Sequence, residues 1–143
     1  MIEELKGKYD IKSVEEMQNL GRRIADNIKG GDVIALIGDL GVGKTEMTKS
    51  IAKSLGIKSH VTSPTFTIVK DYIGDKFRLH HFDVFRMNDS EEFLDIGGME
   101  MLDDGSISII EWADIIKDVL PEDTIYIKLE YAENEYSRTV TIL

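Results

Sequence analysis

The spacing of apolar residues near the N-terminus is helical. Apolar side chains recur every three or four positions, at Val14, Met17, Leu20, Ile24 and Ile28. This spacing places them on one face of an α-helix. The tetrapeptide at 13–16, Ser-Val-Glu-Glu, has the form of a capping box, and two glycines at 30 and 31 follow as a stop signal. The pattern predicts a helix over residues 13–28.

A different pattern begins at position 32. The run Asp32–Ile37 is short, apolar and bounded by glycines, which is typical of a fully buried strand. Helical spacing then returns over Lys44–Leu55. Residues 32–55 therefore predict a strand, a glycine-rich loop and a helix, in that order.

Beyond Pro64 the pattern is mainly that of strands. Segments 66–73 and 77–85 flank Gly74-Asp75 and predict an antiparallel hairpin. The acidic stretch from Asp89 to Gly105 reads as a loop-rich excursion that contains one short helix. The later predicted elements are a helix over 90–96, a strand over 106–111, a helix over 112–120, and strands over 124–131 and 136–143.

Composition narrows the classes of function. The chain has 143 residues, 42% of them apolar and 31% charged, which is typical of one ordered domain spanning residues 1–143. It contains no cysteine, which excludes disulfides and thiolate metal sites and fits a cytoplasmic location. The formal net charge of -10 disfavours direct contact with nucleic acid. The apolar runs are too short to span a membrane.

The loop after the first buried strand carries the clearest chemical signal. Its sequence, Gly38-Asp39-Leu40-Gly41-Val42-Gly43-Lys44-Thr45, matches the P-loop pattern GxxxxGK(S/T). In this pattern backbone amides cradle phosphate, Lys reaches the outer phosphates and Thr binds Mg²⁺. We therefore predict that residues Leu40, Gly41, Val42, Gly43, Lys44 and Thr45 bind ATP with Mg²⁺. The predicted fold is α/β, a P-loop NTPase-like three-layer sandwich with a mixed central sheet flanked by helices.

Two carboxylates stand at the ends of other predicted strands. Asp83 follows the second hairpin strand, and Glu111 ends the strand over 106–111. Strand ends meet the phosphate at one edge of an open α/β sheet. Asp83 is therefore a candidate to organise the metal, and Glu111 to bind Mg²⁺ through water or to polarise the attacking water. Adjacent His80 and His81 point to opposite faces of a strand, and we assign both to structure.

Other polar residues are weaker candidates for contact with the nucleotide. The hydroxyls of Thr62-Ser63-Pro64-Thr65 occupy a turn where switch segments often sense the γ-phosphate, so Ser63 and Thr65 are switch candidates. An ordinary capped turn explains them equally well. The candidate arginines for the γ-phosphate are Arg22, Arg23, Arg78, Arg86 and Arg138.

Four motifs, taken in order, extend this interpretation. GDLGVGKT, SPTFTIV, HHFDVFR and IIEWAD together resemble, in order and spacing, the TsaE family, also called YjeE. The resemblance covers nearly the whole chain. It implies a bacterial cytoplasmic ATPase that assists threonylcarbamoylation of adenosine in tRNA by acting on a complex of TsaD and TsaB. The contact with tRNA is then indirect, which fits the acidic charge.

The resemblance also implies roles for individual residues. Lys44 and the loop amides would hold the ATP phosphates, Thr45 and Glu111 would bind Mg²⁺, and Asp83 would be the Walker B-like acid. Ser63 to Thr65 would form the switch-like segment. The family's GR pair aligns with Ser137-Arg138, which favours Arg138 as the arginine near the nucleotide. The chain departs from the family pattern at Glu46, Met17 and Ala113.

Three other interpretations fit part of the pattern. A small-molecule kinase needs an acceptor pocket and an arginine-bearing lid, for which 143 residues leave little room. A GTPase needs a guanine-reading (N/T)KxD segment, and Ile68-Val69-Lys70-Asp71 lacks the leading Asn or Thr. A binding switch, in which ATP orders the segment near Thr65 without essential hydrolysis, stays open.

Overall fold

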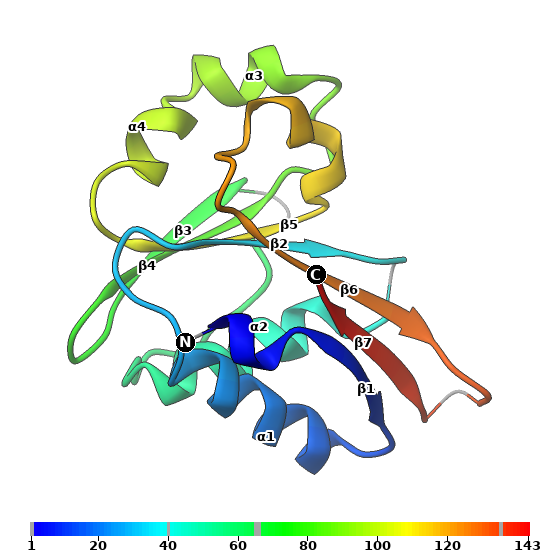
Figure 1. Ribbon diagram of the computed structural model, residues 1–143. Coiled ribbons are helices and arrows are strands. Elements are labelled where there is room, and N and C mark those ends of the chain that lie inside the picture. The colour runs from blue at the N-terminus through cyan, green and yellow to red at the C-terminus, as the bar shows by residue number, and fades with distance from the viewer. Residues whose placement is uncertain (1, 40, 65–66, 135) are drawn as a thin grey trace.

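The central feature of the fold is a mixed β-sheet. The computed structural model describes residues 2–39, 41–64, 67–134 and 136–143. Within these residues seven strands pair in the order β1-β7-β6-β2-β5-β4-β3 (Figure 1). The strands are β1 (Gly7–Ile11), β2 (Val33–Ile37), β3 (Val69–Ile73), β4 (Arg78–Asp83), β5 (Ile107–Glu111), β6 (Ile125–Tyr131) and β7 (Arg138–Ile142).

Helices cover both faces of the sheet. They are the 3₁₀ helices η1 (Ile2–Leu5) and η2 (Ala113–Val119), and the α-helices α1 (Val14–Ala25), α2 (Lys44–Ser54), α3 (Ser90–Asp95) and α4 (Gly98–Leu102). Figure 1 shows α1 and α2 below the sheet, and α3, α4 and the orange segment containing η2 above it. A separate apolar cluster fills each interface, one including Ile24 and Met47, the other Phe82 and Phe93. The predicted three-layer α/β fold is confirmed.

The middle of the sheet is parallel. β2 pairs in parallel with β5 and β6, and β5 pairs in parallel with β4. Every residue of β5 is buried, as are Val33 to Leu36 of β2, because helices cover both faces. The carboxyl ends of β2, β5 and β4 therefore meet at one edge of the sheet. In this register Glu111 pairs with Leu36 on one side and with Asp83 on the other.

Several boundaries differ from the sequence prediction for local reasons. Helix α1 begins at the predicted cap, where Ser13 Oγ accepts from the Glu16 amide at 3.1 Å. It ends at Ala25, earlier than predicted, where the Asn27 side chain donates to the carbonyl of Arg23 at 2.7 Å. The predicted helix over 112–120 is the 3₁₀ helix η2, which follows Trp112 with its φ of 63°.

Strand β1 and helix α4 were not predicted. The β1 sequence, GKYDI, alternates too briefly between polar and apolar residues to predict a strand. Strand β1 forms because it pairs with β7 at the edge of the sheet. Helix α4 lies in the predicted loop-rich excursion. It packs closely beside α3, since a Cβ added at Gly98 would come within 2.4 Å of the Phe93 ring.

The two adjacent histidines lie on opposite faces, as the sequence predicted. His80 is on the α3 side, where its Nδ1 is 2.6 Å from Asp71 Oδ1 and its Nε2 is 2.7 Å from Asp104 Oδ2. Burial lowers the pKa of His80, but the two hydrogen bonds raise it by more, to above the ordinary 6.5. For Asp104, burial raises the pKa, yet hydrogen bonds from His80 and Ser106 lower it to about 2. The protonated imidazole thus joins β3 to the segment before β5.

This pair of contacts makes stability depend on pH. The pKa of His80 is raised in the folded state, so protonated His80 stabilises the fold. This stabilisation is fully present below pH 6.5 and is lost as pH rises through the folded-state pKa. We expect His80→Gln to lower the free energy of unfolding more at about pH 5.5 than at about pH 8.5. Both carboxylates are partly exposed, so solvent screening limits the difference to below about 1 kcal/mol. Urea unfolding at both pH values measures it, and an equal loss at both contradicts it.

Candidate phosphate-binding site

The loop between β2 and α2 has the backbone geometry of an anion cradle. Gly41 and Gly43 have φ of 78° and 116°, in the left-handed region that favours glycine. A Cβ at Gly38 would lie 2.5 Å from the carbonyl oxygen of Leu129, so only glycine fits there. Helix α1 is capped by a serine side chain, whereas α2 has no side-chain cap at Gly43. Its first amides are therefore available to an anion at the positive end of the helix dipole.

Lys44 brings a buried cation to this loop. Its side chain is 5% exposed, and its Nζ donates to the carbonyls of Gly38 and Asp39 at 2.5 and 3.0 Å. The ammonium also lies 4.0 Å from the centroid of the Trp112 ring. Burial lowers the pKa of Lys44 from 10.5, while nearby carboxylates, first that of Glu111, oppose this. The loop thus holds a buried cation. Phosphate oxygens can bind this cation by replacing its two carbonyl partners.

A buried chain of hydrogen bonds joins α2 to β5 and β4. Thr45 Oγ1 donates to the Glu111 carboxylate, with oxygen distances of 3.2 and 3.3 Å. Glu111 is 3% exposed, and its Oε2 lies 2.5 Å from His81 Nε2. His81 is fully buried, and its Nδ1 has no hydrogen-bond partner among the described residues. The imidazole therefore holds the Glu111 carboxylate toward Thr45.

Asp83 lies next to Glu111 at the end of the neighbouring strand. It is 5% exposed, and its Oδ1 accepts from the Phe85 amide at 3.0 Å. Strand alternation places Asp83, His81 and Glu111 on the same face of the sheet, toward α2. The two carboxylates and Lys44 line one cavity of about 350 Å³, together with Gly41, Gly43, Thr45, Glu46, Ser63 and Trp112. Segments distant in sequence thus converge at the phosphate loop.

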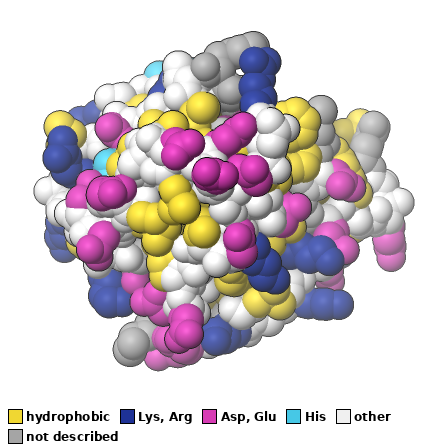
Figure 2. Space-filling model, turned by 90° about the horizontal axis from the view of Figure 1, so that it is seen from above, with side chains coloured by type: hydrophobic (Ala, Val, Ile, Leu, Met, Phe, Trp, Pro, Cys, Tyr) yellow, Lys and Arg dark blue, Asp and Glu magenta, His cyan; other side chains and the backbone are white. Residues whose placement is uncertain are grey.

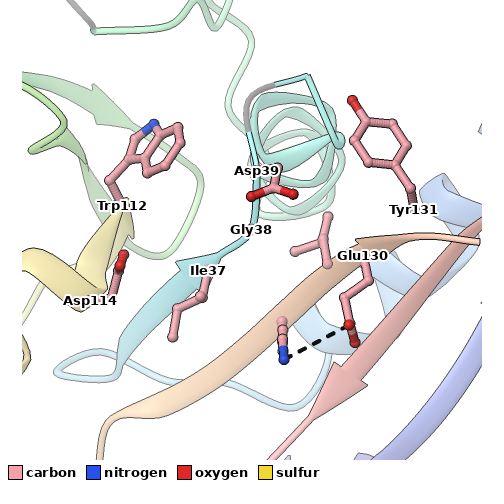
Figure 3. A pocket seen from close by; sticks show the side chains of 9 residues that line it. Ile37, Gly38, Asp39, Trp112, Asp114, Glu130 and Tyr131 are labelled. Carbon is pink, nitrogen blue, oxygen red and sulfur yellow. Dashed lines mark ion pairs between the residues drawn. The ribbon is translucent and has the colours of Figure 1, made fainter.

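A second cavity of about 370 Å³ lies on another side of Trp112. Figure 3 shows Trp112 and Tyr131 flanking Gly38 and Asp39, with Asp114 and Glu130 below them. Lys128, the cation of this lining, is 3.8 Å from Glu130 (Figure 3). Three carboxylates against one paired cation disfavour a phosphate group. The cavity at Lys44 is therefore the better phosphate site.

Arg138 contacts the phosphate loop from strand β7. Its Nε donates to the carbonyl of Val42 at 2.9 Å, and its guanidinium lies 4.5 Å from the Tyr131 ring centroid. Strand β7 carries Arg138 and β6 carries Tyr131, and the two residues are register partners. Among the candidate arginines, Arg138 thus has a direct hydrogen bond to the loop.

Comparison with known proteins identifies the family of the chain. The sequence model of the family described as "Threonylcarbamoyl adenosine biosynthesis protein TsaE" matches residues 11–140. The chain belongs to the TsaE family. It is 39% identical over 128 residues to the tRNA threonylcarbamoyladenosine biosynthesis protein TsaE of Bacillus subtilis, covering 90% of this chain and 80% of that protein. The protein of the same name from Rickettsia prowazekii is 35% identical over 127 residues, or 88% of each chain.

A solved structure also resembles this TsaE-family chain. The crystal structure of YdiB from Bacillus subtilis superimposes with a TM-score of 0.82 at 34% sequence identity. The alignment covers 96% of this chain and 84% of YdiB. The α/β fold with a mixed sheet is therefore shared over nearly the whole length.

The structure describes most of the predicted site residues of this TsaE-family chain, but not all of them. Gly41, Gly43, Lys44 and Thr45 converge with Asp83, Glu111 and Ser63 on one cavity, while Val42 is buried and contacts Arg138 through its carbonyl. Leu40 and Thr65 lie outside the described residues. The roles assigned to all of these residues stay predictions.

Sequence reasoning assigns His81 to structure and does not pair it with Glu111, whose carboxylate it contacts. The signal was present, because His81 is two positions before Asp83 on the same strand and so shares its face.

Proposed function

We propose that this chain binds ATP with Mg²⁺ in the cavity at Lys44 and hydrolyses it to ADP and inorganic phosphate. One observation carries the proposal. A P-loop backbone, a buried ammonium and a Thr45–Glu111 pair line the same cavity as Asp83. Phosphoryl transfer requires these parts, because its catalysis consists mainly of positioning and charge stabilisation.

Thr45 and Glu111 are the residues proposed to hold Mg²⁺. Their oxygens already lie 3.2 and 3.3 Å apart inside the cavity, and hard oxygen donors are the ligands that Mg²⁺ prefers. No group of three or more His, Asp or Glu residues suited to a metal occurs in the described parts of the chain. This fits Mg²⁺, which keeps several waters and takes other ligands from substrate phosphates. When bound, the ion would neutralise charge on the phosphates.

The remaining residues are proposed to bind and orient. Lys44 and the first amides of α2 hold the outer phosphates, and Asp83 supports the metal environment as the Walker B-like acid. Glu111 is also proposed to orient an attacking water. Ser63 borders the same cavity and, with Thr65, is proposed to respond to the γ-phosphate. Arg138 is proposed to contact the nucleotide from the β6–β7 side.

Membership of the TsaE family supports a role in tRNA threonylcarbamoyladenosine biosynthesis. We further propose that the chain acts on a complex of TsaD and TsaB in the cytoplasm, and that ATP hydrolysis resets or activates this complex between turnovers. Contact with tRNA is proposed to be indirect, since a net charge of -10 repels a phosphate backbone. Within the described residues no helix is long and apolar enough to cross a bilayer.

The test is ATP hydrolysis by the chain alone and with purified TsaD and TsaB from the same source. We expect slow release of inorganic phosphate alone and an increase of at least about ten-fold with the complex, because partners often complete P-loop sites. GTP in place of ATP, and mass measurement of other products, test the GTPase and kinase alternatives. An unchanged rate with the complex contradicts partner-assisted hydrolysis. Repeated rounds of tRNA modification with a non-hydrolysable ATP analogue would instead favour the binding switch.

A further inference from the structure

Apolar side chains are exposed on the layer that covers the upper face of the sheet. Leu94 and Ile96, at and after the end of α3, are 45% and 38% exposed. Phe85, whose ring packs on Trp112 directly before η2, is 51% exposed. Ser90 of α3 donates to Asp118, so α3 and η2 are joined side by side. We call this surface, formed by α3, η2 and Phe85, the α3–η2 face.

The charge around these apolar side chains is strongly one-sided. Residues 89–123 contain twelve acidic residues and one basic residue, Lys117, whereas the other 108 residues contain fifteen acidic and sixteen basic residues. The net negative charge of the chain therefore arises from this one segment. All but two of its acidic residues, Glu92 and the buried Glu111, are exposed. Figure 2 looks onto this layer and shows apolar side chains surrounded by acidic ones.

The α3–η2 face adjoins the cavity at Lys44, which is the proposed nucleotide cavity. The Phe85 ring packs on Trp112, with centroids 4.7 Å apart, and Trp112 lines that cavity. The Phe85 amide is held by Asp83 Oδ1. A molecule that contacts Phe85 therefore contacts a residue with two links to this cavity. The Phe85 amide donates a hydrogen bond to Asp83, and the Phe85 ring packs on Trp112, which lies beside Lys44.

We infer that the α3–η2 face docks a protein whose contacting surface is basic around an apolar centre. Nucleic acid and anionic lipid are repelled by the same carboxylates. A basic protein surface is attracted to them, and desolvated contacts with Leu94, Ile96 and Phe85 provide the apolar centre that interfaces require. Docking at Phe85 would also link partner binding to the nucleotide cavity.

The experiment rests on the proposed function and uses the TsaD–TsaB complex as its probe. Binding of the full chain to immobilised complex is measured by biolayer interferometry at about 0.05 M and about 0.5 M salt. The variant Glu91→Lys/Asp95→Lys reverses two charges, at the start and the end of α3. Its matched control, Glu15→Lys/Asp26→Lys, reverses two exposed charges at the start and the end of α1, on the other side of the sheet. A third variant, Leu94→Ser, removes part of the apolar centre.

We expect Glu91→Lys/Asp95→Lys to weaken binding at least about ten-fold at low salt and less at high salt, with the α1 control within about two-fold of wild type. Leu94→Ser is expected to weaken binding at both salts. Unchanged ATP hydrolysis by each variant alone shows that it is folded. If the α3 and α1 charge reversals weaken binding equally, or if neither weakens it, docking at the α3–η2 face is overturned. Binding by the wild-type chain would in that case still support the proposed function. No binding by wild-type chain overturns both this inference and the proposed partner.

Discussion

Lys44→Ala is expected to lower ATP turnover by at least about 10²-fold and to weaken ATP binding severely. The ammonium is buried and lines the same cavity as Glu111 and Asp83. Without it, phosphate would enter a cavity whose remaining side-chain charges are negative. Loss of one preorganised charge contact at a reacting centre lowers turnover by roughly 10²- to 10³-fold. Release of inorganic phosphate measures turnover.

Binding by this variant can be followed with an internal probe. Trp112 is the sole tryptophan and lies 4.0 Å from Lys44 Nζ, so its fluorescence reports on nucleotide entering the cavity. Lys128→Ala is the matched control, because Lys128 is half-exposed, borders the neighbouring acidic cavity and pairs with Glu130. We expect the control to bind and hydrolyse ATP as wild type does. Turnover by Lys44→Ala within about two-fold of wild type would refute the assigned role.

Glu111→Gln is expected to separate binding from turnover. The glutamine keeps the shape of the side chain and an acceptor for Thr45, but it removes the negative charge offered to Mg²⁺ and to the attacking water. We expect turnover to fall by roughly 10²- to 10⁴-fold while nucleotide binding falls much less, since phosphate is held by the loop and Lys44. Steady-state hydrolysis and Trp112 fluorescence titration measure the two quantities. Parallel loss of both would contradict this division of roles.

Two variants of His81 test whether this residue positions the Glu111 carboxylate. His81→Gln can place a donor near the position of Nε2 and is expected to keep most of the turnover. His81→Leu leaves Glu111 buried with one hydrogen bond fewer and is expected to lower turnover about ten-fold, as removal of such supporting contacts does. Equal turnover in the glutamine and leucine variants would show that His81 only fills space.

Local chemistry explains why much of the fold could be predicted from the sequence. The P-loop is one contiguous segment, and its glycines, Lys44 and Thr45 are required by the backbone path and the phosphate itself. The buried strands β2 and β5 are continuous apolar runs because both of their faces are covered. Asp83 and Glu111 could be predicted from their places at strand ends. Strand alternation also placed His80 and His81 on opposite faces.

Contacts between distant segments were decided by the tertiary structure. Thr45 and Glu111 are 66 positions apart, and only the order of strands brings them to hydrogen-bond distance. Strand β1 forms at the edge of the sheet because β7 supplies a partner, since its own sequence has weak strand character.

The sequence by itself thus determined the phosphate loop, the main helices and strands, the class of fold and the resemblance to the TsaE family. These follow from short-range periodicity and from motifs whose chemistry is local. The tertiary structure alone decided that His81 contacts Glu111, that Phe85 and Trp112 join the cavity at Lys44 to the α3–η2 face, and that the net negative charge surrounds exposed apolar side chains there. The physical reason is that side-chain contacts and surface composition depend on which segments the sheet places side by side, and periodicity carries no information on that order.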